Sequence, residues 1–255
     1  MAARDSISAA IRKARESGRP AMVAYVTAGF PSKESFAKNL QAVASEADVI
    51  EVGVPFSDPM ADGTTVQRSS RVALKEGVSL KWIFEFLGRT RVTQCPILLM
   101  TYLNPLLAFG LDKLAKVAAQ AGVSGFIVPD LPYEECAELR DALDKEGLAL
   151  VQLVTPVTPD DRLAMLCKAS QGFVYAVTMT GTTGKNVAVP PEVLAYMDRV
   201  RKVSPIPVCA GFGIRSADQV KLMKDHIDGV VVGSALVEVL ERGEDPAQFL
   251  RALRA

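Results

Sequence analysis

The sequence predicts an α/β protein, folded as a (β/α)8 TIM barrel. Eight short apolar runs rich in β-branched residues recur along the chain, and segments with a helical period separate them. The apolar runs are nearly continuous rather than alternating, which is typical of strands buried on both faces of a parallel sheet. Strands that alternate with helices in this way favour a barrel. The runs cover residues 22–27, 48–53, 96–101, 124–129, 148–154, 172–177, 206–210 and 228–233.

The segments between these runs predict the helices. Phe36, Leu40 and Val43 fall at helical spacing in the first of them, and Gly122 and Gly147 follow two others, as helix C-caps do. The amphipathic N-terminus predicts an extra helix before the first strand, and further helices are expected in the loop regions. The predicted helical segments are 32–46, 79–92, 111–122, 133–147, 159–170, 190–203 and 216–226.

The chain is predicted to be one domain spanning residues 1–255. A barrel of this type needs about 250 residues, and no linker or low-complexity segment divides the sequence. The alternative is an open, doubly wound sheet. It is disfavoured because no predicted strand is followed at once by a Gly-x-Gly-x-x-Gly turn.

Composition excludes several classes of partner. Lys and Arg together number 29, as do Asp and Glu, so no basic field favours nucleic acid or an anionic membrane. No apolar run approaches the roughly 18 residues of a membrane span.

The four cysteines are widely spaced, without metal-ligand spacing, and predict reduced thiols in a cytoplasmic protein. A plastid protein whose transit peptide was removed is the alternative.

The carboxyl ends of the predicted strands are where chemistry is expected. The only histidine, His226, lies at the opposite end of the barrel, before the last strand. Its place disfavours histidine triads and histidine-bound zinc. No lysine lies within a predicted strand, which disfavours a Schiff-base aldolase. Acids and glycines remain as candidates.

Three acids follow one another at the end of the second strand. Glu51 lies in the strand and shares a face with Val49, whereas Asp58 and Asp62 lie in the loop that follows. A carboxylate pointing into a barrel is costly unless it has a function or a partner. The alternatives are a salt bridge between strands for Glu51, turn chemistry for the two aspartates, and a magnesium site made by all three.

Glycines cluster at the ends of the last three strands, in the motifs TGTTG (180–184), AGFGI (210–214) and VGSALVEVL (232–240). Glycine permits close approach of the backbone, so that several amides can converge on one anion. Ser234 would begin a short helix whose N-terminus favours negative charge. These loops predict a phosphate site; the alternative is turn geometry in a barrel that binds no phosphate.

The motifs EVGVPFSDPMADG (51–63), LMTYLNPLLAFG (99–110), PDLP (129–132), TGTTG and AGFGI occur in this order along the chain. Together they closely resemble the alpha-subunit family of tryptophan synthase, from end to end. The resemblance implies cleavage of indole-3-glycerol phosphate to indole and glyceraldehyde 3-phosphate. It also implies a beta-subunit partner in an alpha2-beta2 heterotetramer. No metal or cofactor is expected in this chain, because pyridoxal phosphate belongs to the beta partner.

The resemblance also implies roles for individual residues. Glu51 is expected to be the general acid and base, Asp62 to accept the indole N–H and stabilise charge, and Tyr175 to stand beside Glu51. The remaining expected residues form four groups: a phosphate cradle of Gly184, Phe212, Gly213, Gly233 and Ser234; Thr183 for loop closure; an indole slot of Met100, Tyr102, Ile127 and Leu153; and a partner contact through Pro55, Asp58, Asn104 and Pro105. For the indole slot, ordinary barrel core is the alternative.

Four residues depart from the family pattern. Thr64 stands where proline is expected, and Met179, Lys185 and Asn186 make the closing loop unusual. These changes bear on loop closure rather than on the reaction.

Three alternative functions remain. The first is a different phospho-sugar enzyme, such as an isomerase. The others are a free-standing indole-releasing lyase and a weakly catalytic subunit that mainly activates its beta partner.

Overall fold

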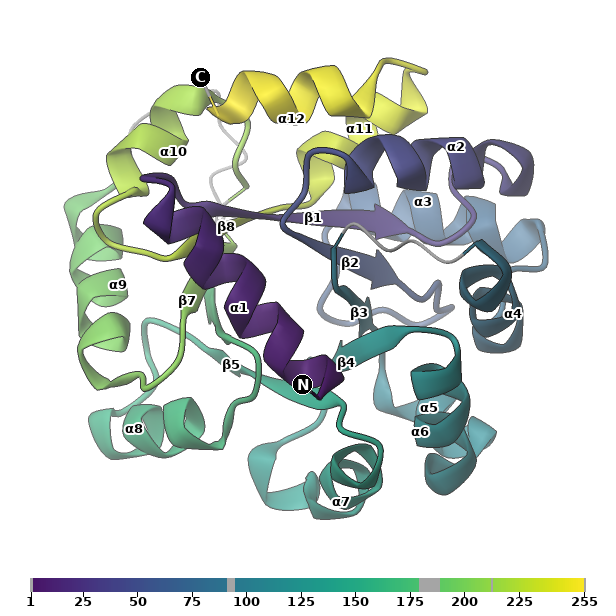
Figure 1. Cartoon of the computed structure of the whole chain (residues 1–255), viewed down its shortest axis with the longest axis horizontal. Helices are drawn as coiled ribbons and strands as arrows, with labels where there is room; N and C mark the ends of the chain where they lie inside the picture. The colour runs from purple at the N-terminus through teal and green to yellow at the C-terminus, as the bar shows by residue number, and fades with distance from the viewer. Residues whose placement is uncertain (1, 91–94, 179–188, 212, 255) are drawn as a thin grey trace.

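The chain forms a closed barrel of eight parallel strands in the computed structural model, which describes residues 2–90, 95–178, 189–211 and 213–254. The strands are hydrogen-bonded in chain order, and β8 closes onto β1 (Figure 1). The predicted fold class is therefore confirmed. The strands are β1 (Ala21–Thr27), β2 (Val49–Gly53), β3 (Ile97–Met100), β4 (Val123–Ile127), β5 (Ala149–Val154), β6 (Val174–Val177), β7 (Val208–Gly211) and β8 (Gly229–Val232).

Helices surround this barrel on its outside (Figure 1). They are α1 (Ala3–Glu16), α2 (Lys33–Ala44), α3 (Thr64–Lys75), α4 (Leu80–Thr90), α5 (Leu103–Phe109), α6 (Leu111–Gln120), α7 (Ala137–Lys145), α8 (Asp160–Ala169), α9 (Pro191–Val203), α10 (Ala217–Met223), α11 (Ser234–Glu241) and α12 (Pro246–Arg254), with a 3-10 turn η1 (Tyr133–Glu135). The extra N-terminal helix is α1. It crosses the front of the barrel in Figure 1 and packs against β1 and β4.

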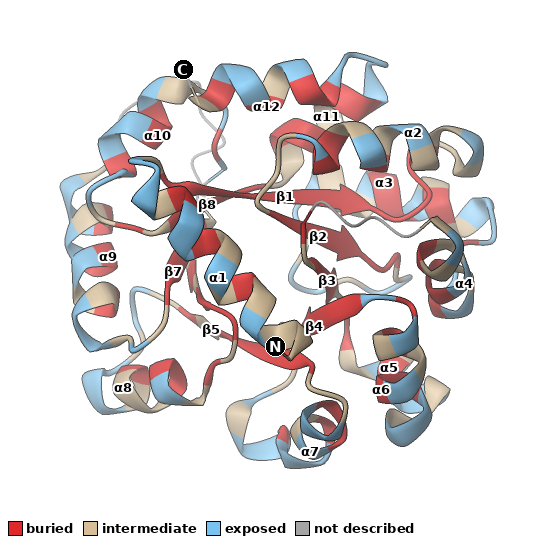
Figure 2. Ribbon diagram, in the orientation of Figure 1, coloured by how far each residue is buried: buried red, intermediate tan, exposed pale blue. Residues whose placement is uncertain are grey.

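The core has two layers. Inside the barrel, side chains such as Val49, Leu98 and Val151 pack with Ile7 and Ile11 of α1, which close the end where the strands begin. A second layer fills the space between the strands and the outer helices. Figure 2 shows the result as buried strands inside helices whose outer faces are exposed. The end where the strands finish is left for the site.

Three helices of the structure, α3, α5 and α12, lie outside the predicted helical segments. Helix α3 buries Ser69, Ser70 and Ala73, so its inner face lacks the apolar period that marks a helix in sequence. Helix α5 is only seven residues long and holds Pro105 in its first turn, where a missing N–H has no consequence. The predicted segment 133–147 also divides into η1 and α7.

Several smaller predictions can be checked directly. Gly122 and Gly147 have φ angles of +83° and +68°, as their positions after helices require. His226 lies away from the site, and its Nδ1 is 2.9 Å from an Asp198 carboxylate oxygen. The four cysteines are buried and free. Among the described helices, none is long and apolar enough to cross a membrane.

Candidate active site

Glu51 points into the barrel from β2. It pairs with Tyr25 of β1 and Leu98 of β3 in the sheet register, and strand alternation puts it on the same interior face as Val49. The side chain is 1% exposed, and its Oε2 has no hydrogen-bond partner among the described residues. Burial, and secondarily the charge of Asp62, raise the pKa of Glu51 to about 8. The side chain therefore holds a proton at neutral pH, unlike an ordinary carboxylate.

Asp62 approaches Glu51 from the loop between β2 and α3. Burial raises the pKa of Asp62, and the hydrogen bond from the Tyr102 hydroxyl opposes this rise. The loop is held at this point because Gln67 Nε2 donates to the backbone oxygen of Asp62 at 2.8 Å. Asp58 instead is exposed, so the structure brings two of the three predicted acids together and leaves the third at the surface.

Two tyrosines flank Glu51 inside the barrel. Tyr175 projects from β6 and Tyr25 from β1, and burial raises the pKa of Tyr175 well above its usual value, so it stays neutral. Each phenol lies where a neighbouring glycine leaves room. A Cβ at Gly211 would come within 2.9 Å of the Tyr175 hydroxyl, and one at Gly53 within 2.1 Å of the Tyr25 hydroxyl.

The predicted phosphate cradle lies at the ends of β7 and β8. Gly213 has a φ of +67°, a conformation that favours glycine, and a Cβ there would meet open space. Gly233 precedes α11, and Ser234 begins this helix, so its first amides are free to face an anion. Gly184, Phe212 and Thr183 lie outside the described residues, as do Met179, Lys185 and Asn186.

One cavity joins these groups. The described residues enclose about 250 Å3, with Glu51 and Asp62 on one side and Gly213, Gly233 and Ser234 on another. Met100, Ile127 and Leu153, three of the residues expected in an indole slot, also line it and form an apolar wall. A flat apolar group and a phosphate can therefore be held in one cavity, with both acids between them.

Tyr102 was also predicted to line the indole slot, but the structure places it behind the acidic loop. Its side chain is 2% exposed and lies outside the described lining of the cavity. The hydroxyl accepts a hydrogen bond from the Ala61 N–H at 3.0 Å, and the ring stacks on Phe56 at 5.1 Å between centroids. Tyr102 thus supports the loop that carries Asp62.

The predicted partner contacts are only partly on the surface. Asp58 and Asn104 are exposed and Pro105 is half-buried, whereas Pro55 is buried two residues after the end of β2. Two exposed apolar residues near these positions were not predicted: Met60 is 78% exposed and Leu107 is 51% exposed.

Tyr25, Gly53 and Gly211 were not singled out from the sequence as site residues. Tyr25 could have been noticed, because it is the one aromatic residue of β1 and pairs in register with Glu51 of β2. Gly211 and Gly53 lie in the motifs AGFGI and EVGVPFSDPMADG, but their contacts with Tyr175 and Tyr25 depend on which side chains stand beside them across the sheet.

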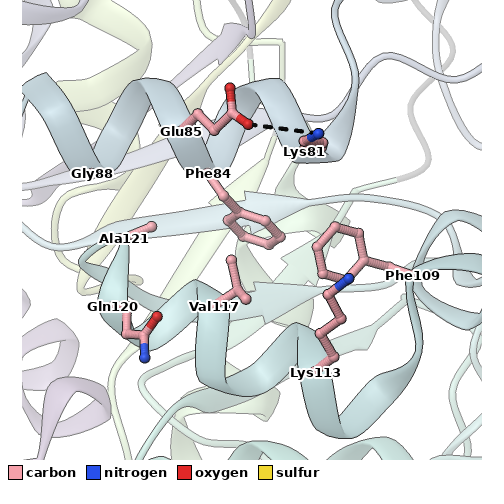
Figure 3. Close-up of a pocket in the computed structure, with 9 residues that line it drawn as sticks. All are labelled: Lys81, Phe84, Glu85, Gly88, Phe109, Lys113, Val117, Gln120 and Ala121. Atoms are coloured by element: carbon pink, nitrogen blue, oxygen red, sulfur yellow. Dashed lines mark ion pairs between the residues drawn. The ribbon is translucent and has the colours of Figure 1, made fainter.

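A second hollow of about 430 Å3 lies outside the barrel, between α4 and α6 (Figure 3). Phe84, Phe109 and Val117 make it apolar, and Lys81 forms an ion pair with Glu85 at its rim, at 4.0 Å. It is the larger hollow, but it lies away from the strand ends, and its acid is exposed and paired. The barrel mouth is therefore the better candidate site.

No group of three His, Cys, Asp or Glu residues in the described part of the chain is placed to hold a metal ion. The three acids that raised this alternative do not converge, because Asp58 lies at the surface. The barrel mouth thus offers the protonated carboxyl group of Glu51, the carboxyl group of Asp62 and the free backbone amides at the start of α11.

Comparison with known proteins points to one family. The family profile described as "Tryptophan synthase alpha chain" matches residues 11–255. The tryptophan synthase alpha chain of Solidesulfovibrio magneticus is 45% identical over 246 residues, covering 96% of each chain. That of Bacillus thuringiensis is 41% identical over 248 residues, again covering 96% of each.

Solved structures agree with these sequences. Tryptophan synthase subunit alpha from Legionella pneumophila superimposes with a TM-score of 0.87 at 32% identity, over 100% of this chain and 97% of that one. A chain of tryptophan synthase from M. tuberculosis, in its aminoacrylate-bound form, gives a TM-score of 0.88 at 33% identity, over 98% of both chains.

Proposed function

Because the chain belongs to the tryptophan synthase alpha chain family, we propose that its barrel mouth cleaves indole-3-glycerol phosphate to indole and glyceraldehyde 3-phosphate. The observation that carries the proposal is the pairing of Glu51 with Asp62. The buried Glu51 carries a proton, and the half-buried Asp62 faces the same cavity. This combination suits a reaction in which a carbon atom must be protonated while positive charge develops nearby.

The reaction proceeds as a retro-aldol cleavage. Glu51 gives its proton to C3 of the indole ring, and the positive charge that results spreads to the ring N–H, where Asp62 accepts a hydrogen bond. The Glu51 carboxylate then takes the proton of the hydroxyl on the adjacent carbon. That carbon becomes an aldehyde, the carbon–carbon bond breaks, and its electron pair restores the aromatic ring. Glu51 ends the cycle protonated, as it began.

The rest of the cavity positions the two ends of the substrate. Met100, Ile127 and Leu153 provide an apolar wall for the indole ring. The amides near Gly213, Gly233 and Ser234 hold the phosphate, aided by the helix that begins at Ser234. Binding energy at the phosphate is thereby available to orient the scissile bond. Tyr175 lines the cavity with Glu51.

The family also suggests a partner. We propose that a beta subunit receives the indole in an alpha2-beta2 complex, and that pyridoxal phosphate is bound only by that subunit. The exposed residues Asp58, Met60, Asn104 and Leu107 lie on the elements that follow β2 and β3, which end at the barrel mouth. In the proposed cleavage Glu51 gives one proton to the indole ring and takes another from the substrate hydroxyl, so the alpha reaction has no need of a cofactor.

One experiment tests the function and its alternatives. Indole release from indole-3-glycerol phosphate is measured with the chain alone and with a beta subunit. Release that rises on adding the partner supports the proposal. Equal release with and without it indicates a free-standing lyase. No release, together with activation of the beta reaction, indicates a subunit that mainly activates its partner.

A further inference from the structure

A chain of buried hydroxyl groups ends at Tyr25. The Tyr25 hydroxyl lies 3.3 Å from Thr27 Oγ1, which lies 2.6 Å from Ser69 Oγ, and Ser69 Oγ lies 2.9 Å from the carbonyl oxygen of Val66. Thr27 and Ser69 are both 0% exposed. These three hydroxyls connect the barrel interior to α3, and Tyr25 is the member that lines the cavity.

The carbonyl at the far end fixes the direction of this chain. A carbonyl oxygen only accepts, so Ser69 donates its single hydrogen to Val66. Thr27 must then donate to Ser69, and Tyr25 must donate to Thr27. This order makes three hydrogen bonds from three hydrogens. It leaves the Tyr25 oxygen without a hydrogen to donate toward the cavity, so that atom can only accept there.

The position of Tyr25 decides which part of a substrate meets this acceptor. The closed barrel runs β8, β1, β2, so Tyr25 of β1 lies between Gly233 at the end of β8 and Glu51 in β2. A Cβ at Gly233 would be 3.8 Å from the Tyr25 Cβ. A substrate whose phosphate lies at Gly233 and whose scissile bond lies at Glu51 must pass over Tyr25 with the carbon atoms between.

We propose that the Tyr25 oxygen is a specificity-determining acceptor for the substrate hydroxyl that lies between the phosphate and the carbon–carbon bond that breaks. The inference rests on the proposed function, which supplies a three-carbon polyol phosphate with one hydroxyl at that middle carbon. That hydroxyl donates to Tyr25, while the hydroxyl next to the scissile bond is left to Glu51.

The first test compares two phosphorylated probes. Glycerol phosphate has the middle hydroxyl, and 3-hydroxypropyl phosphate lacks it but keeps the terminal one. A neutral hydrogen bond corresponds to about 3- to 10-fold in affinity. Unchanged protein should therefore bind glycerol phosphate about 3- to 10-fold more tightly, by calorimetry. Tyr25→Phe, which keeps the ring, should bind both probes equally. If Tyr25→Phe still prefers glycerol phosphate, the proposal is wrong.

The second test addresses the direction of the chain without changing the cavity lining. Dihydroxyacetone phosphate carries a carbonyl at the middle carbon, which can only accept, so an acceptor at Tyr25 should disfavour it relative to glycerol phosphate. In Ser69→Ala, Thr27 loses its acceptor, so the Thr27 hydroxyl donates to the Tyr25 oxygen instead. The Tyr25 hydroxyl then points its hydrogen into the cavity and becomes a donor there. This variant should move the ratio of the two affinities toward dihydroxyacetone phosphate, by about 3-fold or more.

Ser70→Ala is the matched control, because Ser70 is the next residue of α3, is also buried, and lies outside this chain of hydroxyls. It should leave the ratio unchanged. An equal shift in both serine variants, or none in Ser69→Ala, would overturn the assigned direction. The two proposals fail separately: absence of indole release from the unchanged protein contradicts the proposed function, whereas normal release with unchanged probe selectivity in Tyr25→Phe contradicts only the role of Tyr25.

Discussion

Glu51→Gln should abolish most activity and yet make the folded protein more stable at alkaline pH. In the folded chain the pKa of Glu51 is raised from 4.5 to about 8, first by burial and then by the charge of Asp62. The unfolded chain has the ordinary pKa, so it releases the proton more readily. The stability associated with the protonated form is complete below about pH 4.5 and is lost as pH rises to about 8.

The size of the loss follows from the shift. At 1.36 kcal/mol per pKa unit, ionisation of the unfolded chain lowers the free energy of unfolding by about 3 kcal/mol at pH 7 and about 5 kcal/mol at pH 9. These are upper limits, because water entering the cavity would stabilise the charged form. Glutamine has the same shape and no charge, so in Glu51→Gln this residue no longer lowers the free energy of unfolding as pH rises. Its stability advantage should grow between pH 5 and 9.

Urea unfolding at pH 5, 7 and 9 measures this advantage, and indole release measures activity. Activity should fall by about 10²- to 10⁴-fold, the range for loss of a general acid or base. Glu134→Gln is the control, because a hydrogen bond from Arg162 lowers the pKa of that exposed glutamate to about 2. Glu134 is ionised in the folded and the unfolded chain throughout pH 5 to 9, so this variant should show no stability advantage that grows over that range. If Glu51→Gln is no more stable than the unchanged protein at pH 9, the argument for a buried, protonated Glu51 is wrong.

Three further predictions concern the rest of the site. Asp62→Asn should reduce indole release by about 10²-fold or more, since the amide carries no charge. The unchanged protein should stay active in EDTA, and loss of activity there would favour a metal site instead. Gly213→Val should weaken glycerol phosphate binding by about 10-fold or more. The control is Gly243→Val, which has a similar φ of +70° and open space around its Cβ and should lower stability only. Equal phosphate affinity in both variants would show that the cradle is misplaced. Tyr102→Phe removes the hydroxyl that accepts from the Ala61 N–H and donates to Asp62. The kcat should therefore fall by about 10-fold, with little change in phosphate affinity. An unchanged kcat would assign Tyr102 a packing role alone.

The barrel was predictable because its strands have a simple cause. Residues buried on both faces must be apolar almost without interruption, and that pattern is visible in a single sequence. Glu51 was predictable for the related reason that a carboxyl group breaks such a run. Helix α3 was not predictable in this way, because it packs through Ser69 and Ser70, and hydroxyls can be buried when hydrogen-bonded to one another.

The site was less predictable where it depends on contacts across the sheet. Tyr102 was expected in the indole slot, but its hydroxyl accepts a hydrogen bond from the Ala61 N–H and its ring stacks on Phe56, both in the loop between β2 and α3. Tyr25 belongs to the cavity because β1 stands next to β2 in register, which the sequence of β1 alone does not state. Sequence period indicates the face that a side chain occupies, but not the neighbour that it meets.

The two acids have the same chemistry but stand in different surroundings, and this difference assigns their roles. Glu51 is fixed in a strand at 1% exposure, so burial dominates and holds its proton at neutral pH. Asp62 lies in a loop and is only half-buried; burial raises its pKa, and a hydrogen bond from Tyr102 opposes that rise by favouring the charged form. The negative charge of Asp62 in turn raises the pKa of Glu51 further. The charge of Asp62 therefore reinforces the proton on Glu51. A proton on Glu51 with a charge on Asp62 is the distribution that protonation of a carbon atom beside a developing cation requires.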